Sequence, residues 1–343
     1  MTIQKIAQEI ITIIGDYRND DGIQMTAQNV IDWASQFGAK EQLFILEELN
    51  EIFKKRYISK MKAEQFITFA IQKLTVIYEY SSPQSFLEHS VFIDLQKEGK
   101  SQKDMLKMLD TIIKVQYGMS LSDCGSVSSN NYIYLDDIMC TGNTVYFDLK
   151  NWLEQQENGK SNLFKVMAKK SNVICLYIFT HRFNTDKLRW RFYYSHPQFN
   201  LKIHSLVKVD NDYRQPDSKL DVILPIQDNQ LKIVHDYFES LDTNIQGVFR
   251  NKNEPILETF FSSPENRVRF ENLLLVKGIE ILNSVSVQKE NIRPLGFTLP
   301  SHKTFGFGTL CFTWRNIPNN TPLVFWYLSP IWQPLFEKKQ QTK

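Results

Sequence analysis

Apolar side chains recur every three to four positions through the first eighty residues of the chain. The clearest runs are Val30, Trp33, Ala34 and Phe37, followed by Phe44, Leu46, Leu49, Ile52 and Phe53. This spacing places the apolar side chains on one face of a helix. Thr26 suits a helix N-cap, and Gly38 suits a helix end. We therefore predict an all-α segment over residues 1–80, with its aromatic side chains in a core and a surface able to bind a partner protein.

The hydrophobic pattern changes after residues 81–83, where proline disfavours a helix at the position before it. A short apolar run at 91–95 predicts a buried strand. Residues 102–115 predict a helix with one apolar face, and a polar loop at 97–101 separates the two elements. This is the order strand, loop, helix.

The same order recurs further along the chain. Residues 132–135 predict a buried strand, 136–142 a turn and 145–153 a helix, and a third strand follows at 173–179. Strands that alternate with helices at this spacing form mostly parallel sheets with right-handed crossovers. We predict an α/β domain over residues 81–343, with a mostly parallel sheet, behind the N-terminal α-helical segment.

The second half of the chain carries weaker patterns, which we assign to hood or insert elements of the α/β domain. Strand-like runs lie at 221–224, 308–314 and 323–327, and helix-like runs at 231–241 and 265–282. An aromatic stretch around Trp190 also contains basic residues, namely Arg182, Arg189 and Arg191. Such a cluster fits a solvated strand face, or a surface that stacks a base or contacts nucleic acid.

Composition and charge exclude several classes of protein. Apolar residues form 42% of the 343 positions and charged residues 23%, which is ordinary globular usage. The net charge of +2 gives no broad basic field, so nucleic acid would need a local patch or a partner subunit. Four widely spaced cysteines argue against a disulfide scaffold and a structural zinc site. The apolar stretch at 10–14 is too short to span a membrane, and we expect a cytoplasmic protein without membrane contact.

Two adjacent acids follow the predicted strand at 132–135. Asp136 and Asp137 would lie at its carboxyl end, where open α/β sheets bind ligands. The sequence Thr-Gly-Asn-Thr at 141–144 then begins a helix, whose free amides and positive dipole end favour a phosphate. The carboxylates can accept hydrogen bonds from a vicinal diol and can hold Mg²⁺ indirectly through water. Phosphate and diol binding together fit a ribose 5-phosphate.

Each feature is common alone, because acids often end strands and Thr-Gly often caps a helix. Their order, a hydrophobic run, two acids, three residues and Thr-Gly-x-Thr, resembles the phosphoribosyl pyrophosphate motif of type I phosphoribosyltransferases. The resemblance makes Asp136 and Asp137 the catalytic residues, which act on the ribose hydroxyls. It assigns the 5-phosphate to Cys140, Thr141, Gly142, Asn143 and Thr144. Asn143 stands where many members have glycine, and Cys140 where threonine or alanine is frequent.

The resemblance also implies roles for two loops. Gly99, Lys100 and Ser101 follow the first predicted strand, where such enzymes hold pyrophosphate; an exposed turn is the alternative. A Walker A loop is excluded, because Asp94 stands where it requires glycine. Residues 120–131 would be a mobile lid or an ordinary serine-rich loop. His181, just past the third predicted strand, is expected to be a core or surface histidine.

A wider resemblance covers most of the chain. Residues 31–37, 99–101, 318–326 and 332–336 are similar to phosphoribosyltransferase-like proteins of bacterial conflict systems, including retron-associated antiphage effectors. This implies a Mg²⁺-dependent effector that binds phosphoribosyl pyrophosphate or a nucleotide. It would act at C1 of the ribose 5-phosphate, as a glycosyltransferase or a nucleotide N-glycosidase, with protein partners in a defence complex. The alternatives are a non-catalytic nucleotide sensor and a plain protein-interaction module.

Overall fold

The computed structural model describes residues 2–196, 199, 201–212, 219–241, 248–286 and 289–339. Its contacts divide the chain into two compact units. Unit 1 combines Met1–Lys60 with Asp210–Gln340, and unit 2 is formed by Met61–Val209. The grouping differs from a linear division at residue 80, because the first helices pack with the end of the chain and the later ones with the sheet.

Unit 2 is built on a four-stranded sheet in the order β2-β3-β6-β7. Every neighbouring pair in it is parallel. The strands are β2 (Ser90–Phe92), β3 (Asn131–Met139), β6 (Asn172–His181) and β7 (Leu201–Val209). The prediction of an α/β fold with a mostly parallel sheet is therefore confirmed.

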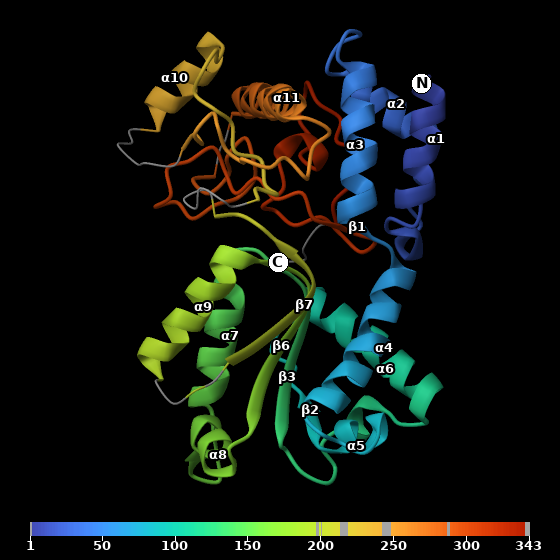
Figure 1. Ribbon diagram of the computed structural model, residues 1–343, viewed down its shortest axis with the longest axis vertical. Helices are drawn as coiled ribbons and strands as arrows, with labels where there is room; N and C mark the ends of the chain where they lie inside the picture. The colour runs from blue at the N-terminus through green and yellow to red at the C-terminus, as the bar shows by residue number, and fades with distance from the viewer. Residues whose placement is uncertain are drawn as a thin grey trace. The chain divides into compact units, whose positions relative to one another are not determined.

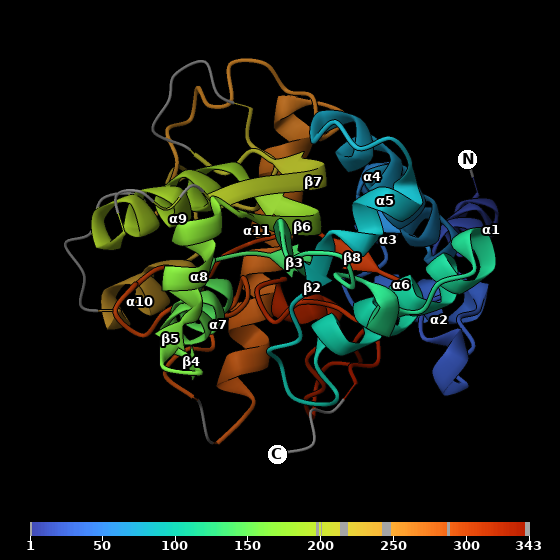
Figure 2. The ribbon, with the colours of Figure 1, turned by 90° about the horizontal axis from the view of Figure 1, so that it is seen from below.

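Helices cover both faces of this sheet (Figures 1 and 2). One face carries α4 (Lys60–Ile77), α5 (Pro83–Glu88) and α6 (Ser101–Tyr117). The other carries α7 (Asn143–Glu154), α8 (Asn162–Lys169) and α9 (Arg182–Ser195), with the small hairpin β4 (Gln156–Glu157) and β5 (Lys160–Ser161). The core under α7 to α9 includes Tyr134, Cys175 and Tyr177 from the strands and Leu149, Leu188 and Phe192 from the helices.

Two sequence predictions in unit 2 are wrong in detail. The predicted turn at 136–142 is strand as far as Met139, because Asp136 and Ile138 pair in register with Tyr177 and Phe179 of β6. The ladder hydrogen bonds thus outweigh the polarity of the side chains. The aromatic stretch around Trp190 is helix α9 rather than a strand face, and its buried residues Leu188 and Phe192 are four positions apart, as a helix requires.

The loop at 120–130 does not lie where a lid would be useful. It precedes β3, and its backbone amides at Gly125 and Val127 donate to carbonyls of Leu87 and Glu88, just before β2. A short 3-10 turn at Leu121–Asp123, capped by Ser120, lies within it. In a parallel sheet this is the amino edge, opposite the ends of β3 and β6. The expectation of a lid over the ligand site is therefore wrong.

Unit 1 is mainly helical and coil. Its elements are α1 (Ile3–Ile14), α2 (Ala27–Ser35), α3 (Gln42–Arg56), α10 (Lys232–Ser240), α11 (Pro264–Asn283), the parallel pair β1 (Tyr57–Ile58) and β8 (Phe312–Thr313), and 3-10 turns at Asn19–Asp21 and Leu323–Phe325. The predicted strand at 323–327 is thus wrong, and that at 308–314 shrinks to β8. Within 221–224, Val222 forms a single bridge, to Thr309. No helix in the described ranges is both long and apolar enough to cross a bilayer.

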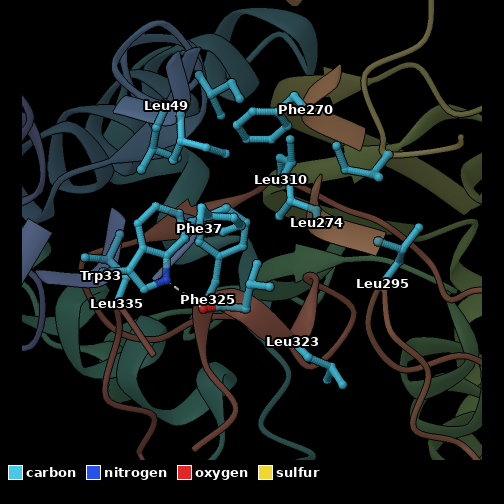
Figure 3. Close-up of a cluster of buried hydrophobic side chains, with 14 of the residues drawn as sticks. Trp33, Phe37, Leu49, Phe270, Leu274, Leu295, Leu310, Leu323, Phe325 and Leu335 are labelled. Atoms are coloured by element: carbon cyan, nitrogen blue, oxygen red, sulfur yellow. Dashed lines mark hydrogen bonds between the residues drawn. The ribbon is translucent and has the colours of Figure 1, made fainter. Parts of the chain in front are cut away.

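An aromatic cluster joins the two ends of the chain in unit 1. Figure 3 shows Trp33 of α2 beside Phe37 and Phe325. The Trp33 indole stacks on Phe325, with ring centroids 5.4 Å apart, and its N–H donates to the carbonyl of Val324 at 2.8 Å. The indole N–H of Trp332 donates to the same oxygen at 2.8 Å. These bonds hold Leu323–Phe325 in a tight turn and leave no extended strand there.

We predict that Trp33→Phe lowers the free energy of unfolding of unit 1 by about 1–3 kcal/mol, because it removes a buried hydrogen bond and leaves a small cavity. The measurement is the urea midpoint of the purified chain. The control is Trp190→Phe, the same change at a side chain that is 60% exposed, which we expect to shift the midpoint little. Equal shifts in the two variants would contradict the role given to Trp33.

Candidate functional site

The carboxyl ends of β2, β3 and β6 meet at one edge of the parallel sheet. The segment 93–100 follows β2, residues 140–142 follow β3, and α9 follows β6. Ligands bind at this edge in open α/β sheets. The structure therefore brings together the two sets of residues that the sequence predicted, the acids with the phosphate turn and the Gly99–Ser101 loop.

Asp136 is the centre of the polar contacts at this edge. Its side chain is 6% exposed, and its Oδ2 accepts a hydrogen bond from Nε2 of Gln96 at 3.0 Å. Burial, and then the charge of Asp137, raise the pKa of the carboxyl to about 7. Hydrogen bonds from the Ser101 side chain, the Asp137 backbone N–H and Gln96 act in the opposite direction. Asp136 therefore changes charge near neutral pH.

A buried network behind Asp136 was not foreseen from the sequence. Gln96 Nε2 also lies 2.6 Å from the hydroxyl of Tyr134, which donates to Asp148 Oδ2 at 2.7 Å. Burial raises the pKa of Tyr134 well above its ordinary value, so the phenol stays a donor. The available signal was the alternation of Tyr134 and Asp136 along one strand face. Gln96 lies in a loop, and nothing in the sequence pattern marks it.

The side chain of Asp137 points to the opposite face of β3 from the side chain of Asp136. Successive side chains of a strand point to opposite faces, so the two carboxylates cannot converge on one ion without a change in the backbone. Asp137 is 8% exposed, and its Oδ1 accepts from the backbone N–H of Ile138 at 2.7 Å. The described residues contain no group of three potential metal-ligating side chains. This donor set fits Mg²⁺ only in the predicted indirect mode, in which water and ligand oxygens complete the shell.

The turn between β3 and α7 has the geometry of a phosphate cradle. Gly142 has φ +75°, a conformation that side chains other than glycine rarely adopt. It precedes α7, and its carbonyl accepts the N–H of Tyr146 at 3.0 Å. Thr141 Oγ1 accepts the N–H of Asn143 at 3.4 Å. The remaining first-turn amides have no acceptor within the helix, and the first turn of α7 contains no acidic residue.

The candidate pyrophosphate loop lies on the same edge. Gly99 is exposed, Lys100 is half-buried as the N-cap of α6, and Ser101 begins that helix against Asp136. The loop is fixed by Gln102, whose Oε1 accepts the backbone N–H groups of Leu95 and Gln96 at 2.7 and 3.0 Å. Gln102 thereby also places Gln96 beside Asp136.

The last residue of β6 and helix α9 each add a contact at this edge. His181 is fully buried, and its Nδ1 lies 3.0 Å from the carbonyl of Met139, which agrees with a core histidine. Arg191 reaches α7, where its Nη1 donates to Oδ1 of Asn143 at 2.8 Å. By contrast, Arg189 is exposed and pairs with Asp186 on its own helix. The sequence grouped Arg191 with Arg189, but only the structure separates their roles.

The raised pKa of Asp136 predicts a pH dependence of stability. The folded state retains the proton from the ordinary value of 3.8 up to about 7, whereas the unfolded state has lost it. The free energy of unfolding therefore falls as pH rises through this window, by at most about 1.4 kcal/mol per pH unit from this group. Asp136→Asn should remove that slope in urea unfolding between pH 5 and 7, and Asp186→Asn should retain it. An unchanged slope in Asp136→Asn would refute the assignment.

Comparisons with known proteins point to one family. Comparison with curated proteins and with solved structures gives no significant match. The family model described as PRTase-CE matches residues 30–338. This span contains most of unit 1, the whole sheet of unit 2, the two acids and the turn at Gly142. The parallel sheet, with acids and a glycine turn at its carboxyl edge, is also the arrangement expected of a phosphoribosyltransferase-like fold. The chain belongs to the PRTase-CE family and is a phosphoribosyltransferase-like protein.

Proposed function

We propose that the chain binds a ribose 5-phosphate ligand, either phosphoribosyl pyrophosphate or a nucleotide, and acts at its C1 atom. One observation supports this most directly. The buried pair Asp136 and Asp137 lies in the last part of β3, and the left-handed turn at Gly142 and the start of α7 follow within a few residues. Acceptors for a diol and amides for a phosphate are thus joined by a short, structured connection.

Each residue set has a role in this proposal. The backbone amides of residues 141–144 bind the 5-phosphate, helped by the positive end of the helix dipole, and the buried Cys140 begins the turn. Asp136 orients the ribose hydroxyls, and Asp137, on the other face of β3, joins it through a change in the backbone. The loop at Gly99–Ser101 holds the pyrophosphate or other leaving group. Mg²⁺ would supply charge neutralisation to the leaving group, held through water by Asp136 or Asp137.

Asp136 must exchange partners when a ligand arrives. Within the chain Gln96 and Ser101 donate to this carboxyl, so ribose hydroxyls would replace one of them. A carboxylate near C1 stabilises the positive charge that develops there when the glycosidic bond breaks. Because burial favours the neutral acid, replacing Gln96 by ligand and ionising Asp136 are linked steps. Glycosyl transfer and nucleotide N-glycosidic cleavage both fit this chemistry.

The biological role we propose is that of an effector in a bacterial antiphage system, of the retron-associated kind. The PRTase-CE family match and the resemblance of both chain ends to such effectors support it. A second candidate is a non-catalytic subunit that senses a nucleotide and signals to protein partners. The burial of both carboxylates and the contacts of Asp136 within the chain favour that candidate, because a site closed by its own side chains resembles a switch.

Variants that remove one carboxylate charge at a time distinguish an enzyme from a non-catalytic sensor. Asp136→Asn and Asp137→Asn keep the side-chain shape, so an enzyme should lose about a hundredfold or more in turnover and much less in ligand affinity. A sensor should lose only affinity. The assay measures pyrophosphate or free-base release from phosphoribosyl pyrophosphate and a nucleotide panel, with calorimetry of the same ligands. Asp94→Asn, an exposed acid in the loop after β2, is the matched control. Tight binding without turnover in the wild type, alone or with its partners, would exclude the enzyme.

Gly142→Ala tests the phosphate turn. A Cβ at this position would meet its nearest atom at 3.7 Å, so space is available, but the φ of +75° is strained for alanine by about 1–2 kcal/mol. We expect the turn to shift and ligand affinity to fall by about tenfold or more. Gly159→Ala carries the same strain at φ +76° in the hairpin of β4 and β5 and should leave affinity unchanged. If the two variants bind the ligand with equal affinity, the 5-phosphate does not bind at this turn.

A further inference from the structure

A cation lies beside the first turn of α7, where the helix itself is already positive. The Arg191 guanidinium is held from two sides by that helix. Its Nη1 donates to Asn143 Oδ1 at 2.8 Å, and its central carbon lies 3.5 Å from the ring centroid of Tyr146. Asn143 is the first residue of α7, and Tyr146 is the residue whose N–H closes the first helical hydrogen bond, to Gly142.

This placement is electrostatically unfavourable without an anion. Helix N-termini favour negative groups, and a cation there is repelled by the helix dipole. Yet the first turn of α7 contains no acid, and Arg191 forms no salt bridge with any described residue. Its neighbour Arg189 shows the usual alternative, a carboxylate partner on its own helix. The stacking on Tyr146 and the bond donated to Asn143 therefore fix a cation that forms no ion pair with a described carboxylate.

The number of donors exceeds what one phosphate can use. A guanidinium has five N–H groups in a planar fork that matches phosphate oxygens. Within the described residues only one hydrogen bond is made by the Arg191 side chain, that to Asn143. The amides of the Gly142 turn already offer enough donors for the three terminal oxygens of a 5-phosphate. The donors left on Arg191 suit a second phosphoryl group beside the first.

We propose that Arg191 recognises a phosphoryl group attached to the 5-phosphate, so that the site prefers ligands with a 5′-diphosphate or 5′-triphosphate over 5′-monophosphates. The inference rests on the proposed function, because it takes the Gly142 turn as the 5-phosphate site. The proposal also gives the side chain of Asn143 a role. Where many phosphoribosyltransferases have glycine, this chain has a side chain that anchors the arginine. Arg191 is thus a specificity-determining residue.

A 5′-polyphosphate occurs on free nucleotides and at the 5′ end of newly made nucleic acid. Helix α9 also exposes Trp190, Tyr193 and Tyr194, and such rings can stack bases of a strand. The phosphoryl chemistry is the same for both sources, so the test compares them directly. A nucleoside 5′-triphosphate is one probe, and a short single-stranded oligonucleotide with a 5′-triphosphate is the other.

The experiment measures dissociation constants of the full chain by calorimetry, with and without Mg²⁺, for the mono-, di- and triphosphates of adenosine, guanosine, cytidine and uridine. At least one triphosphate should bind the wild type about tenfold or more tightly than its monophosphate. Arg191→Met should reduce that ratio to near one while retaining monophosphate binding. Arg191→Lys, which keeps the charge but loses the fork, should give an intermediate ratio. Arg189→Met, a change on the same helix, should keep the wild-type ratio. If the oligonucleotide binds more tightly than every free triphosphate, the natural source of the 5′-polyphosphate is the end of a nucleic acid.

The results of these measurements distinguish a failure of the role given to Arg191 from a failure of the proposed function. Equal wild-type affinity for mono- and triphosphates overturns the role of Arg191 and leaves the proposed function intact. The same holds if Arg191→Met weakens every phosphate ligand equally, since Arg191 would then support the first phosphate only. If the folded wild type binds no nucleotide and no phosphoribosyl pyrophosphate, or if Gly142→Ala leaves binding unchanged, the proposed function fails and this inference with it. Circular dichroism and urea midpoints confirm that each variant is folded.

Discussion

The parallel direction of β2, β3, β6 and β7 is the constraint on which the candidate site depends. Because all four strands end at one edge, the chain must return to the opposite edge after each strand, and every segment that follows a strand contributes to the same surface. Ser101 meets Asp136 for this reason, although 35 positions separate them in the sequence. Arg191 meets Asn143 for the same reason, through the helix that follows β6. An antiparallel arrangement of the same strands would scatter these side chains over two edges.

The second property of the site is that its acids are buried. Removing a carboxylate from water is costly unless hydrogen bonds or opposite charges compensate. For Asp136 the compensation comes from neutral donors, the side chains of Gln96 and Ser101 and the backbone N–H of Asp137. Neutral donors stabilise a carboxylate less than a cation does, and the pKa of Asp136 stays high. The charge of the site is therefore conditional on what binds to it, whereas the charge of Arg191 is permanent.

Local patterns predicted most of the helices, the parallel sheet and the two adjacent acids, because periodicity and strand order are properties of short segments. Features that depend on residues far apart in the sequence could not be predicted in this way. The turn at Leu323–Phe325 looks like a strand until Trp33, 291 positions away, donates to Val324. The end of β3 looked like a turn until β6 paired with it. Gln96 and Arg191 carry no local signal, since their contacts arise only when loops and helices meet at the sheet edge. The lid expectation failed because it ignored on which edge the loop at 120–130 begins.

Unit 1 is formed by two segments of the chain that are separated by unit 2, which affects how the protein folds during synthesis on the ribosome. The segment Met61–Val209 is contiguous, so the sheet and its helices can fold once that stretch has emerged. Helices α1 to α3 emerge before that stretch, yet their apolar faces are covered in part by Phe312, Phe325 and Trp332, which are made after it. While Met61–Val209 is being made, these helices therefore lack that part of their core. A premature stop before residue 312 would release a finished α/β unit attached to a unit 1 that lacks Phe312, Phe325 and Trp332. Its exposed apolar surface would be a substrate for proteases and chaperones.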